Sequence, residues 1–373
     1  MDHDPAALAA APLHLRPRGS SQGGLRQYNE RVVLQAIRLN GSLPGAEIAR
    51  LTNLTAQTIS LITKRLLDDD LLVKGLPQRG KVGQPSVPLA LNPDGAYSVG
   101  IKVGRRNMDV LLVDFTGAVR ERWAIDYAFP DPDVLRSEID QRLREIRRKL
   151  GPARRERVQG VGIAAPLSLG GWQTLLGMPP EVAHKWHRTD LRAEVAELTD
   201  WPVVLLKDTA AACVAELVAG RGRSVKSFLY VFVDTFIGGG LVIDSHLRGG
   251  VHGNAGAIGS LPLGLNTAGG PAPAQLLSVA SLLNLERLYA GAGLDAAAVV
   301  DERALEAPWR PLTDAWLADT GTAMALAINS AACLLDLDGV IVDGSFGRGL
   351  LAEVQASVVR ALDRYSWEGV VRP

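Results

Sequence analysis

The 373 residues are enough for two or three domains, and 47% hydrophobic with 21% charged residues is the composition of an ordinary globular protein. Forty basic side chains balance 40 acidic ones, so the net charge of the whole chain indicates no polyanionic partner. Residues 25–92 nevertheless hold nine basic and five acidic residues, a net charge of +4. The pattern indicates a small basic domain followed by a larger acidic one.

Several classes of protein are disfavoured by what the chain lacks. Cys213 and Cys333 stand in alanine-rich stretches that favour buried helices, without Cys or His neighbours at metal-ligand spacing. We therefore expect structural thiols, no metal and no cofactor. No stretch approaches the ~18 apolar residues of a membrane span. The apolar run at residues 6–13 follows acids and is too short for a secretion signal, so the sequence predicts a cytoplasmic protein without a membrane partner.

The chain begins with a segment that shows no regular pattern. Residues 1–24 are rich in Pro, Gly and Ser, which favours a flexible arm. From Leu25, apolar residues recur at helical spacing until Asn40 and Gly41, which predicts a helix of about 15 residues. A second short helix is expected over residues 44–52.

A third helix and a wing complete the basic segment. Asn53 begins a tight turn, and Thr55 is a candidate N-cap for a helix whose apolar residues are spaced by three and four. Two short strands are expected on either side of the glycine-rich stretch at residues 75–84. Three helices, a turn and a wing predict a winged helix-turn-helix over residues 25–92.

The third helix has the polar residues that a DNA-recognition helix requires. Gln57 is expected to pair with adenine, and wing residues Arg79 and Lys81 to enter a minor groove. A solvated polar face is the alternative for the helix alone, but the turn, the wing and the basic charge together favour DNA binding. The candidate DNA-binding residues, including those expected at phosphates, are Arg26, Asn29, Thr55, Gln57, Thr58, Ser60, Lys64, Arg65, Arg79 and Lys81.

The remainder, residues 93–373, alternates strand-like runs with helices, which predicts an α/β domain. It has no short repeat, although its two halves could be related in fold. The expected strands are 98–103, 109–114, 158–164, 203–206, 228–233, 240–243 and 339–342. The expected helices are 134–150, 209–219, 276–289, 312–335 and 351–364.

One glycine-rich stretch carries a family resemblance. The run Gly238–Ile243, followed by Leu247–Gly259, resembles the signature of the ROK family of repressors, open reading frames and sugar kinases. The resemblance extends to the end of the wing at Gly83–Pro85, to Gly160–Pro166 and to Lys207–Ala211. It implies a two-lobed, actin-like domain with a sugar site in the cleft, and a homodimer or higher homo-oligomer.

The sequence departs from the kinases of that family where they hold ATP. The family turn consists of an acid followed by Gly, Gly and Thr, but here Lys102 replaces the acid and Arg105 with Arg106 replaces the small residues. Asp234 and Phe236 interrupt a second glycine-rich turn. Because phosphates are cradled by backbone amides without obstructing side chains, we expect no kinase activity and no catalytic residue.

The sugar site of the family is also altered. Asp208 occupies the position of the kinase base, where it could contact a ligand or cap a helix. The family sequence Glu-x-Gly-His reads Ala257–Ser260, and no cysteines follow to bind zinc. Lysine beside aspartate indicates either an anionic ligand or an internal salt bridge. The candidate ligand-binding residues are Lys207, Asp208, Asn254, Ser260, Trp186, His184 and His252, of which Trp186 and His184 are expected on a loop that closes over the cleft.

Together these patterns predict a DNA-binding transcriptional regulator rather than an enzyme. We expect a homodimeric repressor of carbohydrate transport or catabolism genes that binds a double-stranded DNA operator. A sugar, sugar acid, polyol or phosphosugar is the expected effector. The alternatives are a ligand-independent DNA-binding scaffold and, with less support, a sugar kinase.

Overall fold

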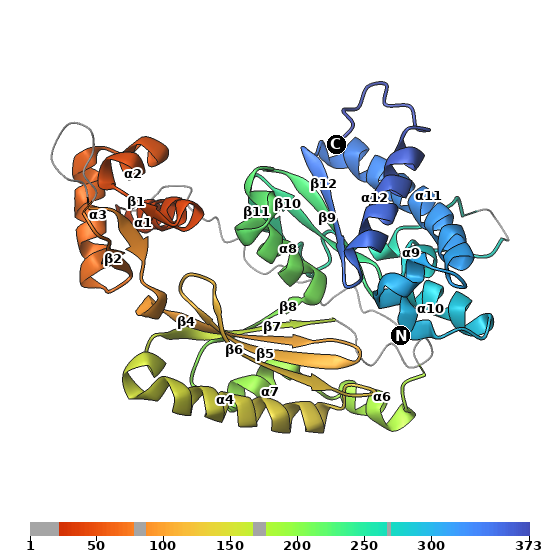
Figure 1. Cartoon of the computed structure of the whole chain (residues 1–373), viewed down its shortest axis with the longest axis horizontal. Helices are drawn as coiled ribbons and strands as arrows, with labels where there is room; N and C mark the ends of the chain where they lie inside the picture. Colours follow the sequence, from red (N-terminus) through yellow and green to blue (C-terminus); the bar gives the residue numbers. More distant parts are fainter. Residues whose placement is uncertain (1–21, 78–86, 167–176, 267–269) are drawn as a thin grey trace, which may run out of the picture. The chain divides into compact units, whose positions relative to one another are not determined.

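The computed structural model describes residues 22–77, 87–166, 177–266 and 270–373 (Figure 1). The chain divides into two compact units. The first comprises the chain up to Ser98 together with residues 112–120 and 150–159, and the second comprises the remainder. The boundary crosses strands β4 (Tyr97–Val103) and β5 (Asn107–Asp114). The first unit therefore contains more than the basic segment.

A three-helix domain with a small sheet makes up most of the first unit. Its elements are α1 (Gln22–Asn40), β1 (Ser42–Leu43), α2 (Gly45–Thr52), α3 (Ala56–Asp68), β2 (Leu72–Lys74) and β3 (Leu89–Leu91). The strands pair antiparallel in the order β1-β3-β2. Apolar residues at helical spacing, including Val33, Ile37, Ile48, Ile59 and Ile62, bury their side chains between the helices. The expected helices are confirmed, and β1 is an element that the sequence analysis missed.

The turn between α2 and α3 is fixed by two residues. Asn53 has φ 55° and ψ 26°, the left-handed conformation that asparagine tolerates better than most residues. Thr55 then begins α3, and its side chain accepts a hydrogen bond of 3.2 Å from the backbone amide of Thr58. This confirms the N-cap and places the start of α3 one turn after the end of α2.

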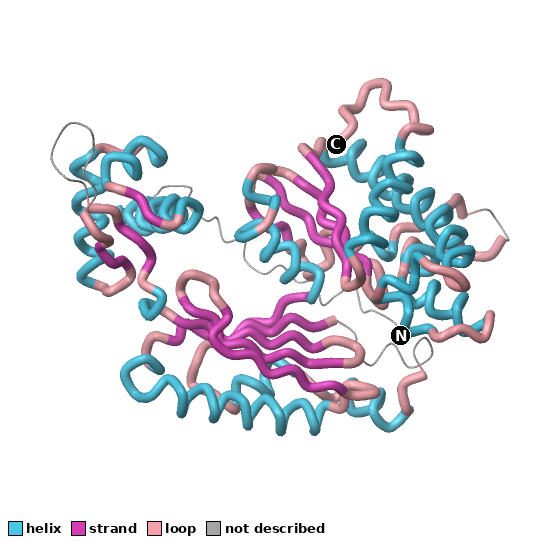
Figure 2. Tube along the Cα trace, viewed as in Figure 1, coloured by secondary structure: helices cyan, strands magenta, loops and turns pink. Residues whose placement is uncertain are grey.

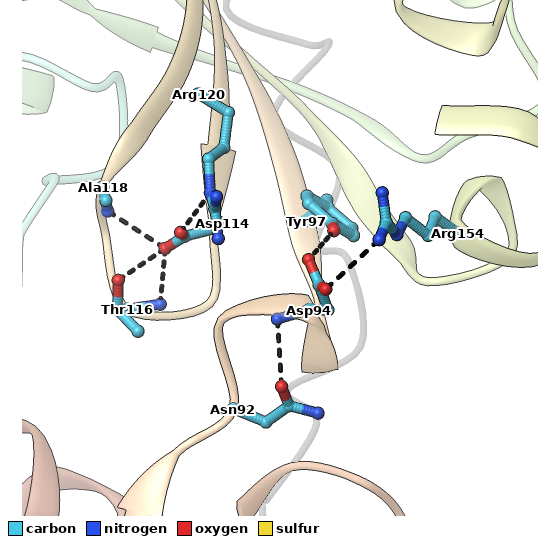
Figure 3. A network of polar contacts seen from close by, with 8 residues as sticks. All are labelled: Asn92, Asp94, Tyr97, Asp114, Thr116, Ala118, Arg120 and Arg154. Carbon is cyan, nitrogen blue, oxygen red and sulfur yellow. Dashed lines mark hydrogen bonds and ion pairs between the residues drawn. The ribbon is translucent and has the colours of Figure 1, made fainter. Parts of the chain in front are cut away.

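A buried carboxylate organises the β5–β6 turn of the first unit (Figure 3). The Asp114 side chain accepts hydrogen bonds from the Thr116 amide (2.9 Å), the Thr116 hydroxyl (2.6 Å) and the Ala118 amide (3.1 Å), and from Nε of Arg120 (2.6 Å). Burial alone would raise the pKa of Asp114, but these donors outweigh it and hold that pKa below its ordinary value.

Further contacts connect this turn and the end of α4 (Pro132–Arg155) to the three-helix domain. Arg38 on α1 donates to the Phe115 carbonyl at 3.0 Å, and its guanidinium lies 5.4 Å from the centre of the Phe115 ring. Asp70, just after α3, accepts a 2.7 Å hydrogen bond from Arg157. Asp94, which accepts from the Tyr97 hydroxyl, forms a 3.4 Å ion pair with Arg154 (Figure 3). We call these contacts, with those of Asp114, the junction network.

Two sheets with related strand order carry the rest of the chain. The first has the order β6-β5-β4-β7-β8, where β6 is Val119–Asp126, β7 Val158–Ala165 and β8 Val203–Lys207. The second has the order β11-β10-β9-β12, with β9 (Phe228–Val233), β10 (Gly238–Ile243), β11 (His246–Arg248) and β12 (Gly339–Gly344). Counted in chain order within each sheet, the first four strands of both follow the pattern 3-2-1-4, and β8 extends the first sheet as a fifth strand. The two halves of the α/β region therefore share a topology.

Helices cover these sheets (Figures 1 and 2). Helix α4 buries Leu135, Ile139, Leu143 and Ile146, spaced by three and four residues, and lies along the first sheet together with α7. The remaining helices are α6 (Pro180–Trp186), α7 (Leu191–Glu197), α8 (Asp208–Ala219), α9 (Leu277–Ala280), α10 (Leu282–Gly291), α11 (Arg310–Leu335) and α12 (Arg348–Leu362). The largest core lies where α11 and α12 pack against the second sheet.

Two sequence-based expectations are corrected here. Cys213 is buried as expected, but Cys333 is exposed because the last turn of α11 extends beyond the core, where Leu334 is 82% exposed. The helix expected over residues 276–289 is interrupted at Ser281, which has φ −84° and ψ 149°, so that α9 and α10 are separate.

In the described part of the chain, no helix is both long and apolar enough to cross a bilayer.

Candidate functional site

The exposed face of α3 is the candidate nucleic-acid interface. Ile59, Ile62 and Leu66 point into the domain, whereas Gln57, Ser60 and Lys64 are exposed. Leu61 lies on the same solvent side and is 62% exposed, a feature that was not predicted from the sequence. The exposed side chains are short or polar near the start of the helix, as base contact requires.

Other residues expected at DNA have partners within the domain. Arg65 donates to Glu30 at 2.9 Å, and Nε of Arg26 lies 3.7 Å from the same carboxylate. The hydroxyls of Thr55 and Thr58 bond to each other at 2.8 Å, which ties them to the cap of α3. Asn29 is half-buried. These contacts leave Gln57, Ser60 and Lys64 as the freest of the predicted residues on α3.

The wing between β2 and β3 carries two further candidate DNA contacts. Its tip, with Arg79, Lys81 and the segment Gly83–Pro85, lies outside the described residues. The strands that flank it, β2 and β3, are present and paired in register. The contacts expected from Arg79 and Lys81 remain predictions.

The second unit contains a cavity of about 320 Å³. Its wall is built by the turn after β4, the junction of β8 with α8, the turn between β9 and β10, and the segment 254–260. Ligand sites in α/β proteins commonly lie at the carboxyl ends of strands, where loops from different strands converge. β4, β8 and β9 all end at this cavity.

Lys207 and Asp208 stand side by side where β8 becomes α8. Asp208 accepts a 2.7 Å hydrogen bond from the Thr209 amide, so part of its capacity is used at the helix start. Burial raises the pKa of Asp208 and lowers the pKa of Lys207. Asp234, at the end of β9, repeats the arrangement with a 2.7 Å hydrogen bond from Thr235. The carboxylates of Asp208 and Asp234, each with one backbone hydrogen bond, and the ammonium group of Lys207 therefore line one cavity.

The glycine run at the start of β10 is explained by packing. A Cβ atom at Gly238 would lie 2.8 Å from Thr209 Cγ2, and one at Gly240 would lie 2.6 Å from the Cβ of Cys213. At Gly239 it would approach the Tyr230 carbonyl to 2.6 Å. These glycines let β10 pack closely against α8 and β9, a role that requires no bound phosphate.

The turn after β4 carries arginines that are already paired. Arg105 lies 3.1 Å and Arg106 3.4 Å from the same carboxylate oxygen of Glu286 on α10. Arg105 and Glu286 are largely buried, at 15% and 12% side-chain exposure. The two guanidinium groups of this turn are thus already paired with a carboxylate of the protein itself.

The structure gathers only some of the predicted ligand residues. Lys207, Asp208, Asn254 and Ser260 line the cavity. His184 and Trp186 belong to α6 rather than to a loop, and they are absent from the described wall of the cavity. The Trp186 indole donates to the Pro130 carbonyl at 2.7 Å, so its polar atom is used structurally.

His252 is exposed and is also absent from the described wall. Conversely, Lys102, Arg105, Asp234 and Thr235 line the cavity but were not predicted as ligand contacts. Their place at or just after the carboxyl ends of strands β4 and β9 was the available signal. Among the described residues, His, Cys, Asp and Glu form no group of three or more suited to a metal ion.

The fold and the cavity define a class: a winged helix-turn-helix followed by a two-lobed α/β domain of the actin-like kinase fold. The family model described as "ROK family" matches residues 98–373, and the chain belongs to this family.

Two curated relatives are repressors by name. The xylose repressor of Bacillus subtilis is 24% identical over 247 residues, which cover 66% of this chain and 63% of the relative. The DNA-binding transcriptional repressor Mlc of Escherichia coli is 24% identical over 237 residues, covering 60% and 55%. These matches span less than two thirds of the length of either relative.

Solved structures support the fold. A ROK family transcriptional regulator described as a homologue of the E. coli MLC protein superposes with a TM-score of 0.64 at 23% identity, covering 92% of this chain and 89% of that one. A ROK family glucokinase from Streptomyces griseus, in complex with glucose and AMPPNP, superposes with a TM-score of 0.54 at 20% identity, covering 73% and 91%. The fold is therefore shared by regulators and kinases, and it does not decide between them.

Proposed function

We propose that the protein is a DNA-binding transcriptional repressor of carbohydrate genes, controlled by a small sugar-derived ligand in the cavity of the second unit. The exposed polar face of α3, with Gln57, Ser60 and Lys64 free of the core, carries the proposal. The names of the repressor relatives support it. A few kcal/mol of coupling between ligand and operator would suffice to switch occupancy.

The state of the β4–β5 turn argues against a kinase. In phosphoryl transfer, a nucleotide phosphate is held by unobstructed amides and a metal-binding acid. Lys102 stands where the kinase resemblance implies the acid, and Arg105 and Arg106 are joined to Glu286. We infer that the cavity binds a ligand without reaction, in a cytoplasmic homodimer that contacts two operator half-sites.

Operator binding tests the proposal. The protein is titrated against DNA from upstream of its own gene, with competitor DNA and at two salt concentrations, and Gln57→Ala is compared with Gln35→Ala. Gln35 is an exposed residue of α1 and serves as a matched control. If Gln57 reads a base, Gln57→Ala weakens specific binding by about 1–3 kcal/mol and leaves non-specific binding unchanged.

Lys64→Ala distinguishes phosphate contact from base contact. Its loss should weaken binding to all sequences and reduce the salt dependence by about one counterion. Salt-sensitive binding without sequence preference, or equal effects of Gln57→Ala and Gln35→Ala, would rule out the operator-reading role of α3.

A further inference from the structure

The charged residues of the cavity indicate the charge of its ligand, provided that the cavity binds an effector as proposed above. Five charged residues line the cavity: Lys102, Arg105, Lys207, Asp208 and Asp234. Arg105 already shares the carboxylate of Glu286 with Arg106. The groups open to a ligand are thus two ammonium groups and two carboxylates.

The two lysines are the groups without a strong partner. Among the described residues, neither Lys102 nor Lys207 forms an ion pair, although Lys207 adjoins Asp208 in sequence. Lys207 and Asp208 therefore do not form a salt bridge that would leave both groups unable to bind a ligand. Burial also lowers the pKa of Lys207, and the attraction of the neighbouring Asp208 offsets only part of this effect.

The carboxylates present a different opportunity. Asp208 and Asp234 each accept one short backbone hydrogen bond, of 2.7 Å, from the following threonine. A carboxylate has about four acceptor positions, so each side chain can still accept from a ligand hydroxyl. The neighbouring hydroxyl groups of a sugar can donate these hydrogen bonds.

The size of the cavity limits the ligand. Its 320 Å³ lies at the lower end of the range of about 300–1,000 Å³ in which small molecules bind. This favours a single sugar unit over a nucleotide.

We propose that the effector is a polyhydroxylated anion the size of a monosaccharide, whose acidic group is bound by Lys102 and Lys207 and whose hydroxyls are bound by Asp208 and Asp234. The acidic group is a carboxylate or a phosphate, since both accept charge-assisted hydrogen bonds from ammonium groups. The acidic group of the ligand would give Lys207 a close ion pair in addition to the attraction of Asp208.

A matched panel of compounds tests this proposal by thermal shift and calorimetry on the full chain. The probes are glucose, gluconate, glucuronate, glucose 6-phosphate and inorganic phosphate. At least one of the three sugar anions should raise the melting temperature, because a ligand of the native state stabilises it. Neutral glucose and inorganic phosphate should have much smaller effects. Gluconate and glucuronate against glucose 6-phosphate separate the carboxylate from the phosphate source.

Variants then locate the anion. Lys207→Gln and Lys102→Gln should each weaken binding of the active anion about tenfold or more. Lys226→Gln, at an exposed lysine outside the cavity wall, should not. Failure of every sugar anion to bind, equal stabilisation by glucose, or an unchanged affinity in Lys207→Gln would overturn the proposal. Specific operator binding by the wild type is measured in parallel, so the repressor function is tested independently of the ligand.

Discussion

Replacement of Asp114 tests how strongly one buried carboxylate stabilises the β5–β6 turn. The Asp114 side chain is 2% exposed and accepts four hydrogen bonds, three of them from the turn itself. Asp114→Asn keeps one carbonyl oxygen, which can retain the bonds from Thr116 and Ala118. It places an amide N–H₂ or a neutral oxygen against the Arg120 guanidinium, so the charge-assisted contact is lost.

The size of the effect follows from the contacts. Hydrogen bonds to charged groups contribute about 1.5–3 kcal/mol and neutral ones about 1 kcal/mol. We expect Asp114→Asn to lower the free energy of unfolding by about 1–2 kcal/mol. Asp114→Ala, which also removes the acceptor of the turn amides, should lower it by about 2–4 kcal/mol. Asp319→Asn, at an exposed site on α11, is the matched control.

Urea unfolding gives the global effect, and hydrogen exchange of the Thr116 and Ala118 amides reports the turn directly. The pH dependence has a defined sign. Because the folded-state pKa of Asp114 is lowered, its stabilisation is complete above the unfolded-state pKa of about 3.9 and is lost as pH falls through the folded value. The difference between wild type and Asp114→Asn should therefore shrink below about pH 4. A difference that stays constant from pH 7 to pH 3 would refute a contribution from the charge.

Two further substitutions test the backbone and the core. Gly321→Ala would place a Cβ atom 2.3 Å from Ser357 Oγ, so α11 and α12 must separate. We expect urea unfolding to show a free energy of unfolding that is lower by about 1–3 kcal/mol. Gly291→Ala, where nothing lies within 4 Å of the added Cβ atom, is the control and should cause no loss. Asn53→Val forces a β-branched residue to φ 55° and should cost about 1–2 kcal/mol, whereas Asn53→Gly should be neutral or stabilising; equal stability of the two Asn53 variants would show that the turn relaxes.

The fold was most predictable where one face of an element is buried. Helices α1, α2 and α3 begin within three residues of the expected positions, since their apolar residues repeat at helical spacing. Strand β6 was missed because it buries none of its residues fully and because charged residues separate its few apolar ones, which hides its alternation of half-buried and exposed residues. The break at Ser281 was missed for another reason: the apolar residues of α9 and α10 continue across it without a gap.

The cavity was less predictable than the fold. Asp208 and Lys207 were found because they adjoin each other in a recognisable stretch. Lys102 and Asp234 lie more than 100 residues apart in sequence, and only the meeting of β4 and β9 at one cavity brings them together. The hydrogen-bond partner of the Trp186 indole, the Pro130 carbonyl, is 56 residues away and could not be predicted from the sequence around Trp186. Long-range pairings of this kind leave no local pattern.

The shared carboxylate of Glu286 bears on how this protein could change during evolution. Replacing Arg105 and Arg106 by small residues would remove two large side chains from the β4–β5 turn, but it would also leave Glu286, which is 12% exposed, without its counter-charges. A buried unpaired carboxylate is strongly unfavourable. Removing Glu286 first would leave two neighbouring guanidinium groups unneutralised. The three positions are energetically coupled across 180 residues of sequence. We therefore expect substitutions at these three positions to depend on one another, so that a change at one is tolerated best when the others change with it.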